Sequence, residues 1–161
     1  MGKKKGTIRI GFQNFNRMTG RDHDPVDTSI RNWITDNNFD VFGISKVNLY
    51  WPKVKKHLQF QERVSQWWAP GQQRSIFAYN KTEKRLIRSI RQYGGTAQIS
   101  RGEAIVREYE HGEDKSGLGW WVWQLYRGAN NKKLRVIQHI DQTHPTDRLQ
   151  YIPNTKLCSM K

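Results

Sequence analysis

The sequence has little of what marks secreted, disulfide-bonded or membrane-spanning proteins. Its 161 residues include one cysteine, Cys158, which excludes an internal disulfide framework and a zinc site made of several cysteines. Its apolar runs fall far short of the ~18 residues that a transmembrane helix needs. The basic start is followed by residues 7–10, which are far too polar for the apolar segment of a secretory signal. We therefore expect a protein of a reducing intracellular compartment, the cytoplasm or the nucleus.

Acidic residues are also scarce. The chain has 14 Asp and Glu against 28 Lys and Arg, which gives a formal net charge of +14. The excess is concentrated in residues 41–110, where thirteen basic and five acidic residues leave +8. Such a surplus favours a polyanionic partner, most often nucleic acid, whereas a basic surface without a partner remains the alternative.

The order of patterns along the chain indicates an α/β fold. Residues 7–15 alternate apolar and polar side chains, as a strand does. Asp27 or Thr28 is expected to cap a helix that ends near Asn37 and Asn38. A strand followed by a helix in this order is typical of the beginning of an α/β domain.

The segments after residue 38 first continue this strand-helix order and are then predicted to be strands only. Residues 39–44 are largely apolar, which is typical of a buried central strand, and Trp51 with Pro52 opens a second helical segment. Period-two patterns then predict strands at 75–79 and 93–100, and a hairpin that joins 120–126 to 134–140.

Two amides, Gln13 and Asn14, stand where the first predicted strand opens into a loop. A side-chain amide at that place can orient a phosphate or a metal-bound water. Taken alone, Asn14 is more typical of a turn, because asparagine accepts turn conformations and bonds its own backbone.

Four short motifs follow one another along the chain. Asn14 closes the first strand, residues 39–45 read FDVFGIS, residues 93–100 read YGGTAQIS, and residues 134–140 read LRVIQHI. Together these motifs resemble the endonuclease/exonuclease/phosphatase superfamily, which includes apurinic-site endonucleases, deoxyribonuclease I and the endonuclease domains of non-LTR retroelements. The similarity is strongest to the retroelement type, notably over residues 42–52.

The resemblance covers residues 7 to about 142. It implies an α/β fold, namely a partial α/β sandwich of two face-to-face mixed sheets flanked by helices. Residues 1–6 are then a basic leader and residues 143–161 an irregular tail. It also implies a Mg²⁺-dependent phosphodiester hydrolase, an endonuclease that acts on DNA or RNA.

The departures from the family's pattern fall on its catalytic positions. Lys46 stands where the metal-binding glutamate is expected, and Ile140 stands where the family often has a tyrosine. No Asp-x-Asn follows Ile140, although the family has such a pair and a terminal Asp-His pair further on. Asn14 remains as a weak, vestigial metal ligand. Because Lys46 replaces the metal-binding glutamate, we expect that the Mg²⁺ implied by the family is not bound.

These departures imply a degenerate, truncated and retroelement-derived nuclease domain that is catalytically inactive. Two other interpretations stay open. One is a basic nucleic-acid-binding or assembly protein that keeps the scaffold without the chemistry. The other is a fragment with no selected function.

A basic run and several tryptophans are candidates for nucleic-acid contacts. The basic residues could follow a phosphate backbone, or they could form a solvated edge between two strands; they are Lys81, Lys84, Arg85, Arg88, Arg91 and Arg101. The tryptophans could stack on bases, although in alternating strands they more often fill a core, and we expect the core; they are Trp67, Trp68, Trp120, Trp121 and Trp123.

A histidine-aspartate pattern near the end of the last predicted strand is a candidate metal site. His139, Asp141 and His144 have H-x-D-x-x-H spacing, which could supply two ligands. Because the pattern lies beside Pro145, a solvated strand end is the more typical interpretation.

Overall fold

The computed structural model describes residues 6–15, 18–21, 24–49, 51–79, 94–128 and 131–140. Strands and helices alternate in the first part of the chain, and strands dominate the second. In chain order the elements are β1 (Ile10–Asn14), α1 (Pro25–Asp36), β2 (Val41–Ser45), the 3₁₀ turns η1 (Trp51–Lys53) and η2 (Lys56–Leu58), α2 (Phe60–Ser65), β3 (Gln73–Ala78), β4 (Thr96–Arg101), α3 (Glu103–Arg107), β5 (Glu108–Glu113), β6 (Trp121–Arg127) and β7 (Lys133–His139).

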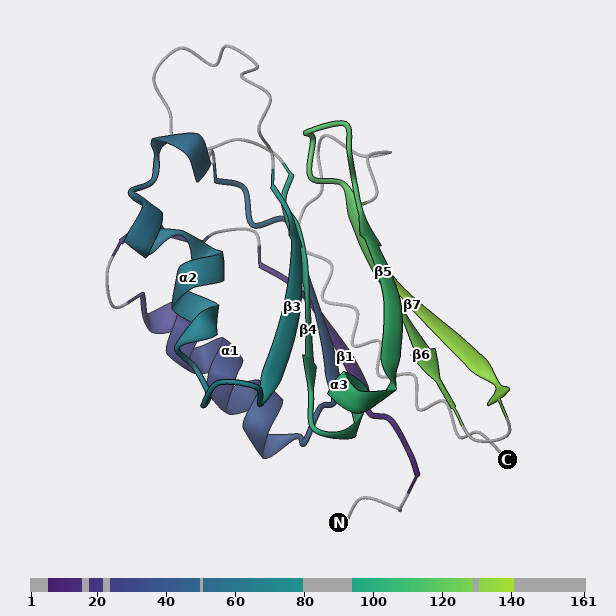
Figure 1. The fold of residues 1–161 in the computed structure, drawn as a ribbon. Coiled ribbons are helices and arrows are strands. Elements are labelled where there is room, and N and C mark those ends of the chain that lie inside the picture. The colour runs from purple at the N-terminus through teal and green to yellow at the C-terminus, as the bar shows by residue number, and fades with distance from the viewer. Residues whose placement is uncertain are drawn as a thin grey trace.

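These elements form three layers (Figure 1): α1 and α2, then a four-stranded sheet, then a three-stranded sheet. The four-stranded sheet has the order β1-β2-β4-β3, with β1 parallel to β2 and the other pairs antiparallel. The three-stranded sheet has the order β5-β6-β7 and is antiparallel throughout. The predicted α/β class is therefore confirmed, whereas the expectation that both sheets are mixed is wrong for the second sheet.

The helices and the four-stranded sheet enclose the main apolar core. Strand β2 is buried along its whole length, because its Phe42 and Ile44 face the helices while Val41 faces the other sheet. From the helical side, Ile30 and Ile34 of α1 are each 1% exposed. Each fully buried side chain of this size contributes roughly 1.5–3 kcal/mol, so this layer fixes the position of β2.

The layer between the two sheets is more polar than that core. Apolar contacts at its ends include Ile76 of β3 with Val122 of β6. At its centre Ser100 of β4 lies 2.7 Å from the hydroxyl of Tyr126, and Ser100 Oγ donates to Gln124 Oε1 at 3.0 Å. Gln98 Nε2 completes the group by donating to the Tyr126 hydroxyl at 3.3 Å. Most of these buried polar atoms bond one another, whereas Gln98 Oε1 has no hydrogen-bond partner among the described residues.

Helix α1 begins earlier than the sequence pattern suggested. Asp24, and neither Asp27 nor Thr28, is the N-cap, and its carboxylate accepts a hydrogen bond from the Val26 amide at 3.0 Å. Pro25 follows as the first helical residue, where a proline loses no hydrogen bond. The predicted cap was wrong because Asp27 lies inside the first turn and pairs with another chain segment.

The second helical segment also differs from the prediction. Trp51 and Pro52 lie in a 3₁₀ turn, and an α-helix starts only at Phe60. Lys55 and Gln59 adopt extended backbone angles, with ψ of 140° and 143°, and these interrupt the helix. The hairpin predicted around residue 128 is confirmed as β6 and β7.

Candidate functional site

The residues that the family resemblance singled out lie at the ends of three strands. Asn14 is the last residue of β1 and pairs with Ser45, the last residue of β2. Lys46 follows Ser45 directly, and Ile140 follows the last residue of β7. We call Asn14, Lys46 and Ile140 the strand-end site.

Backbone hydrogen bonds connect these three strand ends. The Phe15 amide donates to the Ser45 carbonyl at 3.0 Å, which ties β1 to β2 just before Lys46. The Val47 amide donates to the Gly95 carbonyl at 3.2 Å, and the Gly95 amide donates to the Gly119 carbonyl at 3.0 Å. Gly119 precedes Trp120, whose carbonyl accepts from the Ile140 amide at 2.9 Å. The strand-end site therefore lies at one end of the two-sheet core.

The backbone at Lys46 is in the left-handed region, with φ of 55°, which is uncommon for a residue with a side chain. Asn48 has the same conformation, with φ of 54°. The turn that they form is held by two bonds to Gly94, whose amide donates to Asn48 Oδ1 at 3.1 Å and whose carbonyl accepts from the Asn48 amide at 2.8 Å. These bonds hold the backbone that follows Lys46 at the end of β2, and the Lys46 residue is half-buried.

A carboxylate at this end of the core, Asp114, already has partners. Its oxygens accept from the Ser116 amide and hydroxyl at 2.8 Å each and from the Trp120 amide at 2.9 Å. Burial raises the pKa of Asp114, but these hydrogen bonds outweigh burial and hold the pKa below its usual value. Asp114 therefore stabilises the loop between β5 and β6.

The strand-end residues do not fit the Mg²⁺ ion that the family resemblance implies. A magnesium ion requires near-octahedral oxygen ligands, usually carboxylates and water. Lys46 presents an ammonium group, and Asn14 presents a neutral amide. Within the described ranges, no group of three His, Cys, Asp or Glu side chains is arranged to hold a metal ion.

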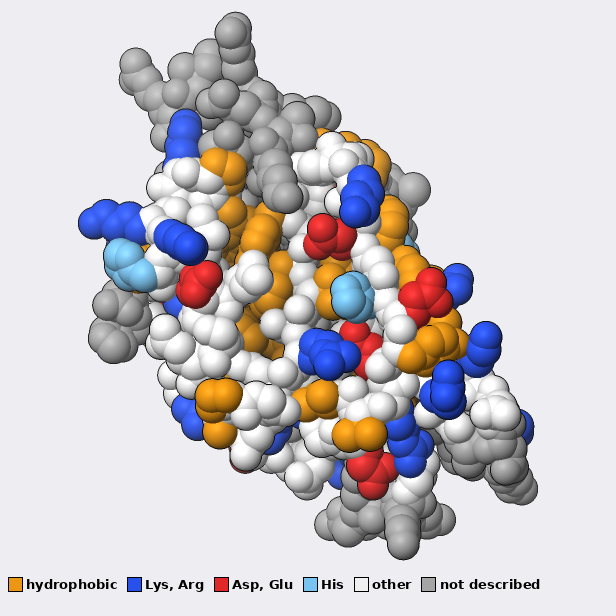
Figure 2. All heavy atoms as spheres, viewed as in Figure 1, with side chains coloured by type: hydrophobic (Ala, Val, Ile, Leu, Met, Phe, Trp, Pro, Cys, Tyr) orange, Lys and Arg blue, Asp and Glu red, His pale blue; other side chains and the backbone are white. Residues whose placement is uncertain are grey.

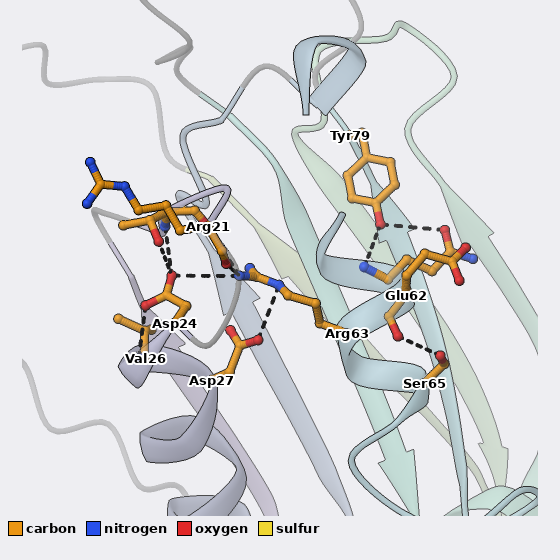
Figure 3. Close-up of polar contacts among 10 residues, drawn as sticks. Arg21, Asp24, Val26, Asp27, Glu62, Arg63, Ser65 and Tyr79 are labelled. Carbon is orange, nitrogen blue, oxygen red and sulfur yellow. Dashed lines mark hydrogen bonds and ion pairs between the residues drawn. The ribbon is translucent and has the colours of Figure 1, made fainter. Parts of the chain in front are cut away.

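A buried charge cluster, which the sequence analysis missed, lies beside the helices (Figure 3). Arg63 of α2 points between Asp24 and Asp27 at the start of α1, with its Nε 3.2 Å from Asp27 Oδ2 and its Nη1 3.8 Å from Asp24 Oδ2. The same Nη1 donates to the carbonyls of Thr19 and Arg21 at 3.2 and 3.0 Å. Arg63 thereby joins α2 to α1 and to residues 18–21, which follow β1.

The two carboxylates of this cluster respond differently to burial. Burial raises the pKa of Asp27 to about 6, although the Arg63 charge opposes the shift. For Asp24, burial also acts to raise the pKa, but hydrogen bonds from Thr19 and Val26 and the charge of Arg63 lower it overall. Because Arg63 is far in the sequence from Asp24 and Asp27, only a predicted contact between α1 and α2 could have revealed the cluster.

A second buried carboxylate, Glu108, lies between the sheets. Its side chain is fully buried and accepts from Gln124 Nε2 at 2.8 Å, and it pairs with His111 at 3.1 Å and Arg74 at 3.9 Å. Burial raises the pKa of Glu108 against the opposing charges of Arg74 and His111.

The predicted basic run is described only at its last residue. Lys81, Lys84, Arg85, Arg88 and Arg91 lie outside the described residues. Arg101 ends β4, with its guanidinium 4.1 Å from the centre of the Trp68 ring. Burial lowers the pKa of Arg101, and the contact with Trp68 indicates that its side chain takes part in packing.

Of the tryptophans and histidines singled out in the sequence, some lie in the core and others on the surface. Trp67 is buried with a 7% exposed side chain, as expected. The expectation of a core position is wrong for Trp121, which is 37% exposed. His139 lies at the exposed end of β7, whereas its proposed companions Asp141 and His144 lie outside the described residues.

Comparison with models of known protein families gives no match, and comparison with curated proteins gives none either. In the described part of the chain, no helix is both long enough and apolar enough to cross a membrane.

Proposed function

We propose that the chain is a catalytically inactive domain of the endonuclease/exonuclease/phosphatase type, of retroelement origin, that binds nucleic acid without hydrolysing it. The observation that carries this proposal is that Lys46 directly follows Ser45, the last residue of β2, which is paired with Asn14 at the end of β1. The two-sheet core, with helices on the four-stranded side, is consistent with an α/β sandwich of that type.

Electrostatics at Lys46 supports the absence of metal-dependent cleavage. An ammonium group about 4 Å from a dication, at an effective dielectric constant of about 20, is repelled by roughly 8 kcal/mol at the upper end. The substitution also removes the carboxylate that would have offset the ion's charge. A phosphodiester, in contrast, is an anion that an ammonium and an amide can contact directly.

The charge of the whole chain supports nucleic acid as the partner. A net charge of +14 produces a long-range attraction for a polyanion. In this proposal Lys46 and Asn14 bind one phosphate, and basic residues elsewhere supply contacts that do not depend on base sequence.

Binding and cleavage must be measured together to test the proposal. We expect a labelled oligonucleotide to bind equally well in Mg²⁺ and in EDTA, and plasmid DNA to remain uncut in both. Lys46→Gln should lower the slope of log affinity against log salt by about 0.7–0.9, the value of one phosphate contact. Lys55→Gln, which changes an exposed lysine beside η2, is the control of equal charge and should lower the slope less. Nicking by the wild-type chain that EDTA abolishes would overturn the proposal.

A further inference from the structure

The outer face of the three-stranded sheet exposes several large apolar side chains. Alternate residues of a strand face opposite sides, and Val122, Gln124 and Tyr126 of β6 face the four-stranded sheet. Trp121 and Trp123 therefore face outward. Figure 1 shows no helix over this outer face within the described residues.

Cross-strand pairing gathers these outward side chains into one surface. Trp123 is opposite Ile137 of β7, and Trp121 is opposite His139. The exposed fractions are 37% for Trp121, 39% for Tyr109 and 52% for Ile137, so a wide apolar area meets solvent. We define the aromatic face by seven residues: Tyr109, Trp121, Trp123, Arg127, Lys133, Arg135 and Ile137.

Cations lie on the rings of this face. The guanidinium of Arg135 is 4.8 Å from the centre of the Trp123 ring. Arg127 and Lys133 approach the Tyr109 ring at 5.3 and 5.8 Å. Figure 2 shows basic and hydrophobic side chains next to one another along the side of the molecule that carries β5.

The charge of the aromatic face is positive. Its three cations form no ion pair with a carboxylate of the described residues. One acidic residue, Glu110, is opposite Leu125 and therefore lies on the same outer side of the sheet, where the three cations outnumber it. The face is therefore complementary to an anion that also carries flat apolar groups.

Gly112 of β5 allows the Trp123 indole to lie close against the sheet. A Cβ atom at Gly112 would be 2.5 Å from Trp123 Nε1 and 2.7 Å from Cε2, which no real contact reaches. Because glycine stands there, the indole extends over β5, and Arg135 lies above the ring. The result is a stacked pair, Arg135 on Trp123, held on a rigid sheet.

We propose that the aromatic face binds single-stranded nucleic acid, with bases stacked on Tyr109, Trp121 and the Arg135–Trp123 pair, and with Arg127 and Lys133 bonding phosphates. This inference rests on the proposed function for its partner class and adds the surface and the strand state. Aromatic rings on a sheet, interleaved with cations, bind unpaired bases because every base has a stacking face. A duplex offers the same phosphates but keeps its bases stacked on one another, so it gains only the electrostatic part.

The test compares single-stranded and duplex oligonucleotides of equal length by fluorescence anisotropy at several salt concentrations. The wild-type chain is expected to bind the single strand, oligo-dT or oligo-U, more tightly than the duplex. Tyr109→Leu with Trp121→Leu keeps the charge and should remove this preference, by about tenfold for each stacked base lost. Arg127→Gln, Lys133→Gln and Arg135→Gln together should weaken single-strand binding further and reduce its salt dependence.

A matched control removes the same charge from the helical side of the molecule. Arg31→Gln, Lys55→Gln and Lys56→Gln together change three exposed cations there, and single-strand binding should fall less than in the aromatic-face variant. Circular dichroism and thermal unfolding verify that each variant folds, and sedimentation gives its oligomeric state.

Each outcome has a distinct consequence. Equal losses in the two triple variants, with equal affinity for single strand and duplex, would overturn the aromatic-face proposal and leave general nucleic-acid binding intact. A dimer that the leucine variant converts to a monomer, with binding unchanged, would also overturn it, because the face would then join two copies. If the wild type binds no nucleic acid at low salt, both this proposal and the proposed function fail.

Discussion

The carboxylate of Asp27 lies 3.2 Å from Arg63 Nε, yet burial raises its pKa to about 6. The ion pair does not compensate for the loss of water around the carboxylate, and Asp27 Oδ1 is buried without a hydrogen-bond partner among the described residues. The Asp27–Arg63 ion pair therefore connects α1 to α2, and its contribution to the stability of the fold depends on pH.

The first prediction concerns that dependence. The folded-state pKa of Asp27, about 6, exceeds its ordinary value of 3.8, so the folded protein binds the proton more tightly. The resulting stability is fully present below about pH 4 and is lost as the pH rises through 6. A shift of this size corresponds to roughly 3 kcal/mol at most. Urea unfolding at several values between pH 4 and 7 should show the decrease.

Asp27→Asn should flatten this pH profile. Asp36→Asn, which changes an exposed residue of the same helix, is the control and should retain the wild-type slope. Part of the slope should remain in Asp27→Asn, since burial also raises the pKa of Glu108. Identical profiles for the wild type and Asp27→Asn would contradict the assignment.

The second prediction concerns Arg63 itself. Arg63→Met should lower the free energy of unfolding by about 3–5 kcal/mol, since it leaves the buried Asp24 and the half-buried Asp27 without their cation. Arg31→Met on the exposed side of α1 should cost less than about 1 kcal/mol. In the double variant Arg63→Met/Asp27→Asn, the loss should be smaller than in Arg63→Met; additive losses would count against a direct pairing.

The third prediction addresses the polar layer between the sheets. Tyr126→Phe removes a hydroxyl that contacts Gln98, Ser100 and Gln124. Because three buried groups lose a partner, the free energy of unfolding should fall by about 1–3 kcal/mol. Tyr109→Phe makes the same chemical change on the outer face and should stay within about 0.5 kcal/mol. If the two variants lose the same free energy of unfolding, the hydrogen bonds of the Tyr126 hydroxyl do not stabilise the layer between the sheets.

The fourth prediction concerns Gly43 in the central strand β2. A Cβ atom there would be 2.5 Å from Phe12 Cδ1 and in collision with Gln138 Oε1, so β1 and β7 both approach the strand at this point. Gly43→Ala should therefore destabilise the protein by about 1–3 kcal/mol through overpacking. Adding Gln138→Ser removes one of the two obstacles and should restore part of the loss. No loss in Gly43→Ala would contradict the close approach of β7 to β2.

Segments with a marked apolar pattern could be predicted from the sequence, whereas segments rich in charged residues could not. The apolar run at residues 39–44 gave the central strand, because burial on both faces leaves that pattern. The strand β5 was missed because residues 108–113 read EYEHGE, and only its pairing with β6 holds it in a sheet. The N-cap at Asp24 had a usable signal, since a proline follows it at the first helical position.

The tryptophans illustrate a limit of pattern analysis. Residues 120–126 are apolar or aromatic on both faces, so alternation alone does not tell which face is inside. Gln124 and Tyr126 face inward because Gln98 and Ser100 satisfy them, and Trp121 is consequently turned outward. For the strand-end site, the sequence named the positions, whereas the turn at Lys46 and its bonds to Gly94 and Gly95 required the structure.

Titration of the chain with Mg²⁺ by isothermal calorimetry tests the central claim about Lys46 most directly. The wild type should show no binding at the strand-end site. Lys46→Glu should gain weak binding, since a carboxylate beside the Asn14 amide can hold an ion that keeps most of its waters. If the wild type binds Mg²⁺ as tightly as Lys46→Glu does, Lys46 does not occupy a metal position, and the account of the site is wrong.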